Sequence, residues 1–170
     1  MEFTFDTVYN SAALTAMARA LRKTLRKKSS RRSHIFGLIV LALVLVLSIA
    51  NGFAVTFKNI VTWLAGAAIL IALIWEDRMN GHFAGRKMMA EMKRSMTTFT
   101  DEGYHSHTEL GDSDFPYDKI KAVAETRDYF VLMYSRNHAQ VYDKRGLEGN
   151  ANAFRKFIEE KTGCSIEYVK

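Results

Sequence analysis

The sequence predicts an α+β membrane protein, in which a two-helix transmembrane hairpin precedes a small antiparallel-sheet domain closed by a C-terminal helix. The first observation is a long run, residues 35–75, in which Lys58 is the only charged side chain. The second is that the net charge of +6 is matched by residues 1–34 alone, which hold eight basic and two acidic side chains. The third is that short β-rich segments separated by turns begin at Met96. A basic soluble protein would not confine its charge to one flank of an apolar run.

Residues 1–34 are predicted to form a short strand and a basic amphipathic helix. From Glu2 to Thr7, phenylalanines alternate with polar residues, as in a strand added to the edge of a sheet. Apolar residues then recur with helical spacing from Leu14 to Leu25, and arginine and lysine lie mostly on the other faces. Such a helix beside a transmembrane span is expected to lie on the inner membrane surface.

The basic residues of this region are candidates for contact with anionic lipid head groups, since each contributes about 1 kcal/mol near an anionic leaflet. They are Arg22, Lys23, Arg26, Lys27, Lys28, Arg31 and Arg32. Nucleic acid is the competing partner for such a cluster. The cluster lacks interleaved aromatic residues for base stacking and adjoins a span, so no nucleic-acid partner is expected.

Residues 35–76 are predicted to form the transmembrane hairpin. Two uncharged stretches, 35–57 and 59–75, would give helices of about 34 and 26 Å, against a hydrocarbon core of about 30 Å. The turn is expected at Asn51-Gly52. The alternatives are a buried hairpin in a soluble protein, which normally keeps a polar face, and a signal peptide cleaved after Ala50, which a second apolar stretch would not follow.

The hairpin is expected to be an anchor, because neither uncharged stretch contains an ionisable side chain that could carry ions or protons. Ala65, Ala68 and Ala72 repeat with helical spacing and are expected to let the two helices pack closely. Basic residues flank both spans, whereas the connecting loop has only Lys58. The positive-inside rule therefore predicts that both termini are cytoplasmic.

Residues 77–95 are predicted to form a connector helix. Met89, Met92 and Met96 repeat at helical spacing, with Met88 beside them. Methionine adapts to irregular apolar surfaces, so Met88, Met89 and Met92 are candidate residues for binding a partner. Packing of this helix on the adjacent domain is the alternative explanation.

Residues 96–170 are predicted to form the sheet domain. The β-rich runs begin near residues 97, 104, 120, 129 and 140, and Gly111-Asp112-Ser113-Asp114 is expected to be a turn. A helix is expected from Asn150 to Lys161, with Gly163 as its stop. The tail, residues 164–170, has no predicted role.

Several segments resemble the C-terminal domain of the YcxB-like family: TFTDEG (98–103), FPYDKIKAVAET (115–126), DYFVL (128–132), Lys144-Arg145 and the helix from Phe154 to Ile158. The order of strand, helix, hairpin and domain also resembles that family. The resemblance implies a bacterial integral membrane protein whose cytoplasmic domain is similar to a pleckstrin-homology fold. It brings no catalytic residues and no cofactor.

Candidate chemistry is sparse in this sequence. His105 and His107 share one face of a predicted strand, and His138 in a turn could approach them to bind a metal. The expected state, however, is that these histidines are exposed and hold no ion. A metal-dependent hydrolase is therefore the least favoured alternative, and no metal or cofactor is expected.

Two further side chains, Glu125 and Cys164, are expected to be chemically passive. Glu125 is expected to pair with Lys121 or Arg127 at the surface, where ion pairs contribute little. Cys164 is the only cysteine, so no intrachain disulfide is possible, and no base is predicted beside its thiol.

Taken together, these expectations favour a non-enzymatic, membrane-anchored scaffold or regulatory module at the bacterial cell membrane, with two spans and both termini in the cytoplasm. The expected partners are the lipid bilayer, its anionic head groups, and an unidentified protein or another copy of the chain. A subunit of a transport or efflux assembly is the alternative, in which several hairpins would line a pore.

Overall fold

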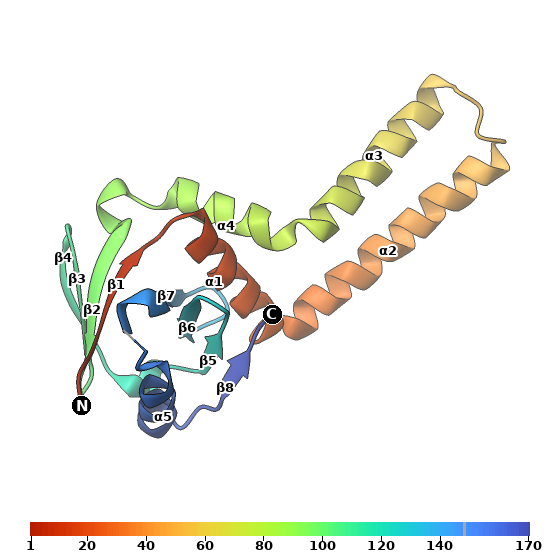
Figure 1. The fold of residues 1–170 in the computed structure, drawn as a ribbon. Coiled ribbons are helices and arrows are strands. Elements are labelled where there is room, and N and C mark those ends of the chain that lie inside the picture. The colour runs from red at the N-terminus through yellow and green to blue at the C-terminus, as the bar shows by residue number, and fades with distance from the viewer. Residues whose placement is uncertain (148) are drawn as a thin grey trace.

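In a computed structural model that describes residues 1–147 and 149–170, a long helical hairpin projects from an α+β domain (Figure 1). The helices are α1 (Ser11–Lys23), α2 (Lys27–Ala50), α3 (Phe57–Ile74), α4 (Glu76–Lys87) and α5 (Ala151–Thr162). The strands are β1 (Phe3–Val8), β2 (Arg94–Phe99), β3 (Tyr104–Thr108), β4 (Gly111–Phe115), β5 (Ala122–Glu125), β6 (Tyr129–Met133), β7 (Ala139–Asp143) and β8 (Ile166–Tyr168).

Two four-stranded sheets build the domain. The first has the order β1-β2-β3-β4 and is antiparallel throughout, and its first pair aligns Phe3 with Phe99. The second has the order β7-β6-β5-β8, in which β8 runs parallel to β5. The N-terminal strand therefore joins the sheet as its alternation predicts, although the whole hairpin separates it from β2 in the sequence.

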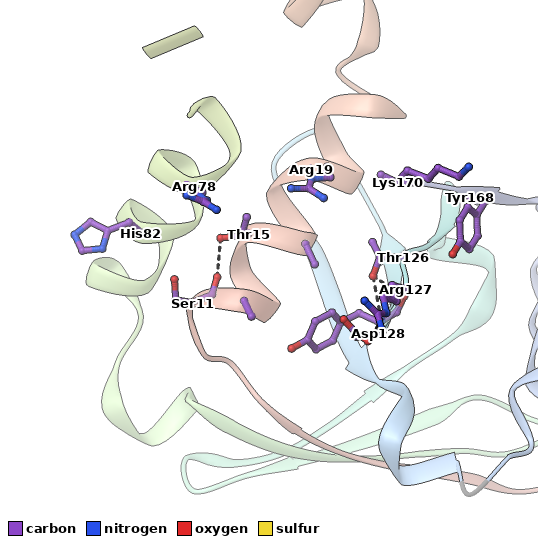
Figure 2. Close-up of a pocket in the computed structure, with 14 residues that line it drawn as sticks. Ser11, Thr15, Arg19, Arg78, His82, Thr126, Arg127, Asp128, Tyr168 and Lys170 are labelled. Carbon is purple, nitrogen blue, oxygen red and sulfur yellow. Dashed lines mark hydrogen bonds and ion pairs between the residues drawn. The ribbon is translucent and has the colours of Figure 1, made fainter. Parts of the chain in front are cut away.

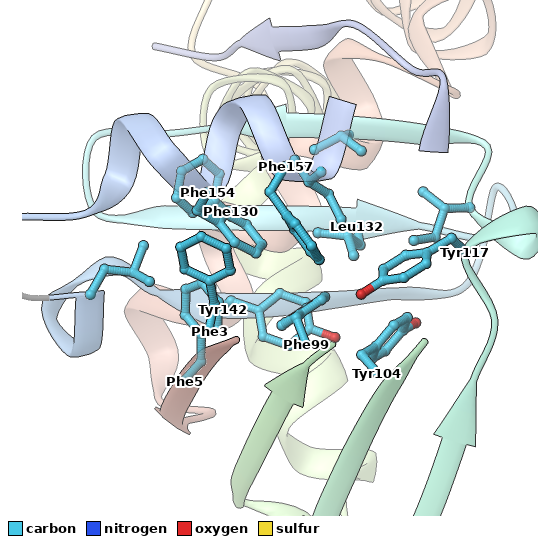
Figure 3. Packing of buried hydrophobic residues seen from close by; sticks show 14 residues of the cluster. Phe3, Phe5, Phe99, Tyr104, Tyr117, Phe130, Leu132, Tyr142, Phe154 and Phe157 are labelled. Carbon is cyan, nitrogen blue, oxygen red and sulfur yellow. The ribbon is translucent and has the colours of Figure 1, made fainter. Parts of the chain in front are cut away.

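An aromatic core lies between the two sheets and α5 (Figure 3). Phe5, Phe99, Phe130 and Phe154 are fully buried, and the ring of Phe154 lies 4.8 Å from that of Phe5 and 4.9 Å from that of Phe130. Such aromatic pairs contribute about 0.5 to 1.5 kcal/mol beyond the area they bury. The predicted apolar face of the last helix is thus part of the core, and Gly163 ends this helix in the left-handed conformation.

The opposite face of the second sheet is covered by α1. Ala13, Ala16 and Ala20 on this helix belong to a second buried cluster that includes Val131 and Val141 of the sheet. Small side chains on α1 allow the helix to lie close to the strands. All five residues of β6 are buried, as expected for a strand covered on both faces.

Helix α4 crosses α1 at Gly81, where the two backbones nearly touch. A Cβ atom added at Gly81 would lie 2.8 Å from the backbone nitrogen of Thr15. At Gly85, by contrast, an added Cβ would meet only the Cδ1 of Leu14, at 3.0 Å. The close approach at Gly81 fixes how α4, and with it the end of α3, sits on the domain.

The hairpin consists of two helices, α2 and α3, that are long and apolar enough to cross a membrane. Their contact is made by Gly37 against Leu73 and by Gly66 against Val44. The indole Nε1 of Trp63 also donates a hydrogen bond of 2.8 Å to Ser48 Oγ.

The alanines predicted to mediate this contact do not lie in it. Ala65, Ala68 and Ala72 are exposed, whereas Gly66 is buried against α2. The spacing of the alanines was correct for one face of a helix, but it could not tell which face meets α2. The turn at Asn51-Gly52 lies where it was predicted, with Gly52 at a positive φ of 60°.

Other predicted boundaries differ from the structure. Helix α2 begins at Lys27 and not near residue 35, because lysine and arginine continue a helix as readily as leucine. The residues predicted to form a turn at 111–114 form strand β4, which pairs with β3. The tail without a predicted role contains β8, which extends the second sheet.

The expected surface pairing of Glu125 is wrong, since its carboxylate is buried between two cations. Arg155 Nε and Nη2 each donate a hydrogen bond of 2.6 Å to it, and Lys144 Nζ also contacts it. The turn after β7 and the helix α5 bring these cations over β5, in place of Lys121 or Arg127. Burial would raise the pKa of Glu125, but the hydrogen bonds from Arg155 and Lys144 outweigh it and leave this pKa below its ordinary value.

Two half-buried tyrosines predict a loss of stability in alkali. Burial raises the pKa of Tyr9 and of Tyr134 to about 12, from an ordinary value of 10.0. Because an unfolded chain ionises these phenols at the lower pH, their stabilisation is complete below pH 10 and is lost as the pH rises to about 12. Each contributes no more than about 3 kcal/mol.

We therefore expect the domain to lose its near-ultraviolet circular dichroism between pH 10 and 12, together with a rise in tyrosinate absorbance. A full rise in tyrosinate absorbance near pH 10, with the dichroism unchanged, would contradict this prediction.

Candidate functional site

The base of the hairpin is held to the domain by charged side chains. The Arg22 guanidinium donates two hydrogen bonds to the Asp77 carboxylate, Nε to Oδ1 at 2.6 Å and Nη2 to Oδ2 at 2.7 Å. The hydrogen bond with Asp77 raises the pKa of Arg22. Arg19 Nε lies 3.4 Å from the same carboxylate. Since Asp77 is in the first turn of α4, these contacts join α1 to the helix that continues from α3.

A second group of contacts joins α2 to the same place. His34 Nε2 lies 2.9 Å from Glu76 Oε2, within ion-pair distance although not aligned for a hydrogen bond. Ser30 Oγ donates a long hydrogen bond of 3.4 Å to Glu76. We call Arg19, Arg22, Ser30, His34, Glu76 and Asp77 the hairpin base. It links α1, α2 and α4 where the two long helices begin and end.

Three residues that were predicted to contact lipid are thus engaged within the protein. Arg22 binds Asp77, as described. Lys23 Nζ donates to the backbone oxygen of Lys170, at 2.8 Å, and Arg26 Nε donates to the backbone oxygen of Arg136, at 2.6 Å. These contacts fasten the junction of α1 and α2 to the tail and to the β6–β7 turn, and sequence alone could not reveal such distant partners.

The other predicted lipid-contact residues remain available to lipid. Lys27, Lys28, Arg31 and Arg32 are exposed in the first turns of α2. Within the described residues, none of them forms an ion pair. They lie just before the apolar part of α2.

A groove near the hairpin base lies along the exposed face of α1 and has a volume of about 950 Å³ (Figure 2). Its floor consists of small side chains of α1, Ser11, Ala12, Thr15 and Ala16. One wall is α4, with Arg78 and His82. The other wall is formed by the loop after β5 and by the tail, with residues 126–129 and 168–170. We call this the α1–α4 groove.

The α1–α4 groove is rich in positive charge. Arg19, Arg78, Arg127 and Lys170 line it, against one acidic side chain, Asp128. Arg127 Nε is 4.0 Å from Asp128, and both are exposed. Arg78 and Lys170 form no ion pair with any described side chain. Figure 2 shows Arg78, Arg19 and Lys170 spread across the groove in that order, with the Lys170 ammonium directed away from Arg19.

An apolar stripe runs along α4 outside this groove. Trp75, Met79 and Phe83 follow one another at intervals of four residues, and they are 42%, 39% and 52% exposed. The stripe begins directly at the end of α3. The stripe is not prominent in the sequence because α4 as a whole is polar, although the four-residue spacing from Trp75 is a signal that could reveal it.

The methionines predicted to bind a partner do not share a helix face. Helix α4 ends at Lys87, Met88 and Met89 are extended, and Met92 ends a short 3₁₀ turn. The predicted connector helix is wrong beyond residue 87, because the chain must turn there to begin β2 opposite β1. Met89 and Met92 are nevertheless exposed, so their role in binding a partner stays a prediction.

The histidines lie apart from this region. His105 and His107 share the exposed face of β3 and pair with Asp114 and Asp112 of β4, with Nδ1 to Oδ1 distances of 2.7 and 2.5 Å. The hydrogen bond with Asp114 raises the pKa of His105. His138 lies in the turn after β6, in the other sheet. Among the residues described, no three His, Cys, Asp or Glu side chains are grouped to hold a metal, so a metal-dependent hydrolase gains no support.

Residues 99–158 match the family model described as YcxB-like protein, so the resemblance noted in the sequence is confirmed for this segment. The segment runs from the end of β2 into α5 and covers about a third of the chain. The strand β1, the helix α1, the hairpin and β8 lie outside it. No curated protein and no solved structure matches the chain.

Proposed function

We propose that this protein, which carries a YcxB-like segment, is a membrane-anchored, non-enzymatic module that presents its α+β domain to a partner at the cytoplasmic face of a bacterial membrane. The observation that carries the proposal is the hairpin base. Arg22 and Asp77 join α1 to α4 by two charged hydrogen bonds, and Gly81 lets the same helices meet backbone to backbone. A domain held in this way keeps one face toward the bilayer and the others free.

The cytoplasmic orientation is supported by two features. Pairing of β1 with β2 requires the segments before and after the hairpin to lie on the same side of the membrane. The basic residues at the start of α2, such as Lys27 and Arg31, favour the cytoplasmic side. The pleckstrin-homology-like character that the resemblance implies remains a prediction.

Strand β4 is the proposed docking edge for a protein partner. It pairs with β3 on one side and is the last strand of its sheet. Its residues 111–114 are exposed, and the carboxylates of Asp112 and Asp114 pair with His107 and His105 of β3 on one face of the sheet. An open edge can accept a strand from another chain. The two carboxylates favour a partner strand with basic side chains over a second copy of β4.

A transport assembly is the second candidate, and one observation favours it. Ala65, Ala68 and Ala72 are exposed on α3, away from α2, where a hairpin of another subunit could pack closely. In that case several copies would be needed to enclose a pore.

Photo-crosslinking in native membranes separates these candidates. A crosslinking amino acid placed at Asp114 on β4 is expected to yield one adduct of defined mass, whereas the same group at the exposed Asp118, outside the sheets, yields none. Equal adducts from both positions, or only monomer across concentrations, would contradict docking at β4. Solute flux through proteoliposomes of the purified chain would support transport instead.

A further inference from the structure

We infer that the α1–α4 groove binds the phosphate group of an anionic lipid, as a defined site in addition to the diffuse charge at the start of α2. This inference rests on the proposed anchoring in the membrane. It assigns a ligand class to a groove whose cationic residues come from separate parts of the chain. Arg78, Arg127 and Lys170 were not singled out as lipid contacts by the sequence.

The charge of the groove fits an anion. Arg19, Arg78, Arg127 and Lys170 line the groove, and Asp128 is the one acidic side chain among the lining residues. Cations gathered in this way repel one another, and a bound phosphate relieves that repulsion. Arginine offers a phosphate two parallel N–H donors, and lysine adds a mobile point charge.

Under the proposed anchoring, the cationic groove lies next to the lipid head groups. Arg78 is in the first turn of α4, and only Trp75 separates that helix from α3. The backbone oxygen of Lys170 accepts a hydrogen bond from Lys23 in the last turn of α1, just before α2 begins. Arg19 reaches Asp77 in the hairpin base. Three of the cations are thus next to the ends of the proposed spans.

Helix α4 favours a lipid over a soluble phosphate as the ligand. Its exposed stripe of Trp75, Met79 and Phe83 suits a helix that lies in the membrane interface, with tryptophan at the level of the head groups. Arg78 and His82 each precede a residue of this stripe and so lie about 100° around the helix from it. When the stripe contacts the leaflet, these side chains border both the groove and the head groups.

The floor of the groove leaves room for a head group. Ala12 and Ala16 present only methyl groups, and Ser11 and Thr15 present short hydroxyl side chains. Thr15 Oγ1 already donates to the backbone oxygen of Ser11, at 2.7 Å, which satisfies its hydroxyl hydrogen. A phosphate in the groove would therefore be held by the walls, with the floor setting its depth.

The test uses the full chain in an uncharged detergent and counts bound lipid by native mass spectrometry. The probes are short-chain phosphatidylglycerol, short-chain phosphatidylcholine and inorganic phosphate. The groove variant carries Arg78→Gln and Lys170→Gln, chosen because neither side chain forms an ion pair with a described residue. The matched control carries Lys121→Gln and Lys156→Gln, which remove the same charge from two exposed positions outside the groove that form no ion pair with a described residue.

We expect one phosphatidylglycerol to bind in preference to phosphatidylcholine. The groove variant should bind phosphatidylglycerol at least about tenfold more weakly, as expected for the loss of charged hydrogen bonds. The control variant should change this affinity by less than about threefold. Equal losses in the two variants would reduce the site to diffuse surface charge. Inorganic phosphate binding as tightly as phosphatidylglycerol would overturn the assignment to lipid.

Failure of the site is distinguishable from failure of the anchor. Sedimentation of the groove variant with membranes after washing in alkaline carbonate reports the anchor alone. Retention in the membrane without preference for phosphatidylglycerol would remove the groove site and leave the anchoring proposal intact. Loss of the unsubstituted chain from the membrane would contradict the anchoring proposal itself.

Discussion

Replacing Phe5 with alanine is expected to lower the free energy of unfolding of the α+β domain by about 3 to 5 kcal/mol. The Phe5 side chain is fully buried, and its ring lies 5.5 Å from that of Phe99 and 4.8 Å from that of Phe154. Its removal leaves a cavity where β1, β2 and α5 meet. The loss would show that a strand encoded before the hairpin is an integral part of the domain encoded after it.

The single cysteine offers a local measurement of this effect. Cys164 is partly buried and packs against the aromatic core, so its rate of modification by a thiol reagent in rising denaturant reports opening of the domain. Thr4→Ala is the matched control, because Thr4 lies on the exposed face of the same strand. We expect the control to change stability by less than about 0.5 kcal/mol. Equal protection of Cys164 in both variants would mean that β1 does not stabilise the core.

Replacing Gly81 with alanine is expected to destabilise the protein by about 2 kcal/mol, although alanine favours an isolated helix by about 1 kcal/mol. The added Cβ would lie 2.8 Å from the nitrogen of Thr15 and 2.9 Å from its Cα. These are backbone atoms, so they can yield only if α1 and α4 separate. Separation would also strain the Arg22–Asp77 contact.

Gly85→Ala is the control for this prediction. There the added Cβ meets the flexible end of Leu14, and the gain in helix propensity should leave stability unchanged or raised by up to about 1 kcal/mol. Thermal unfolding followed by circular dichroism in detergent should place Gly81→Ala about 4 to 8 °C below the unsubstituted chain. Midpoints that fall equally for both variants would contradict a specific backbone contact at Gly81.

Local sequence could predict the parts of the fold that have a strong periodic pattern or a characteristic turn or helix-ending residue. The alternation around Phe3 and Phe5 predicted a strand, and the uncharged run predicted the hairpin with its turn at Asn51-Gly52. Gly163 was recognised as a helix stop because glycine readily adopts the left-handed conformation that it shows.

Other elements depend on pairing that local sequence does not contain. Residues 111–114 have the composition of a turn, yet they form β4, because an edge strand exposed to solvent does not need apolar residues and β3 supplies its hydrogen-bond partners. The methionine spacing after Lys87 suggested a helix, but the pairing of β2 with β1 overrides it. Beyond these, β8 is a strand only because β5 lies beside it.

The candidate site was predictable in its charge and not in its geometry. The basic residues before the first span were evident, but Arg22 and Arg26 resemble Lys27 and Lys28 in a linear sequence. Only their distant partners, Asp77 and Arg136, separate structural cations from those free to meet lipid. The groove required Lys170 and Arg78 to come together, which depends on the packing of α1 against both α4 and the second sheet.

The pairing of β1 with β2 also sets an order of events during synthesis. Thr4 and Thr98, which face each other in this pair, are 94 residues apart, and both long helices are made between them. Of these two strands, β1 leaves the ribosome first, and Phe3 and Phe5 stay uncovered until β2 has been made. Under the proposed anchoring, a chain in which only one of the two helices crossed the membrane would hold β1 and β2 on opposite sides, so the strand would stay unpaired and the core open.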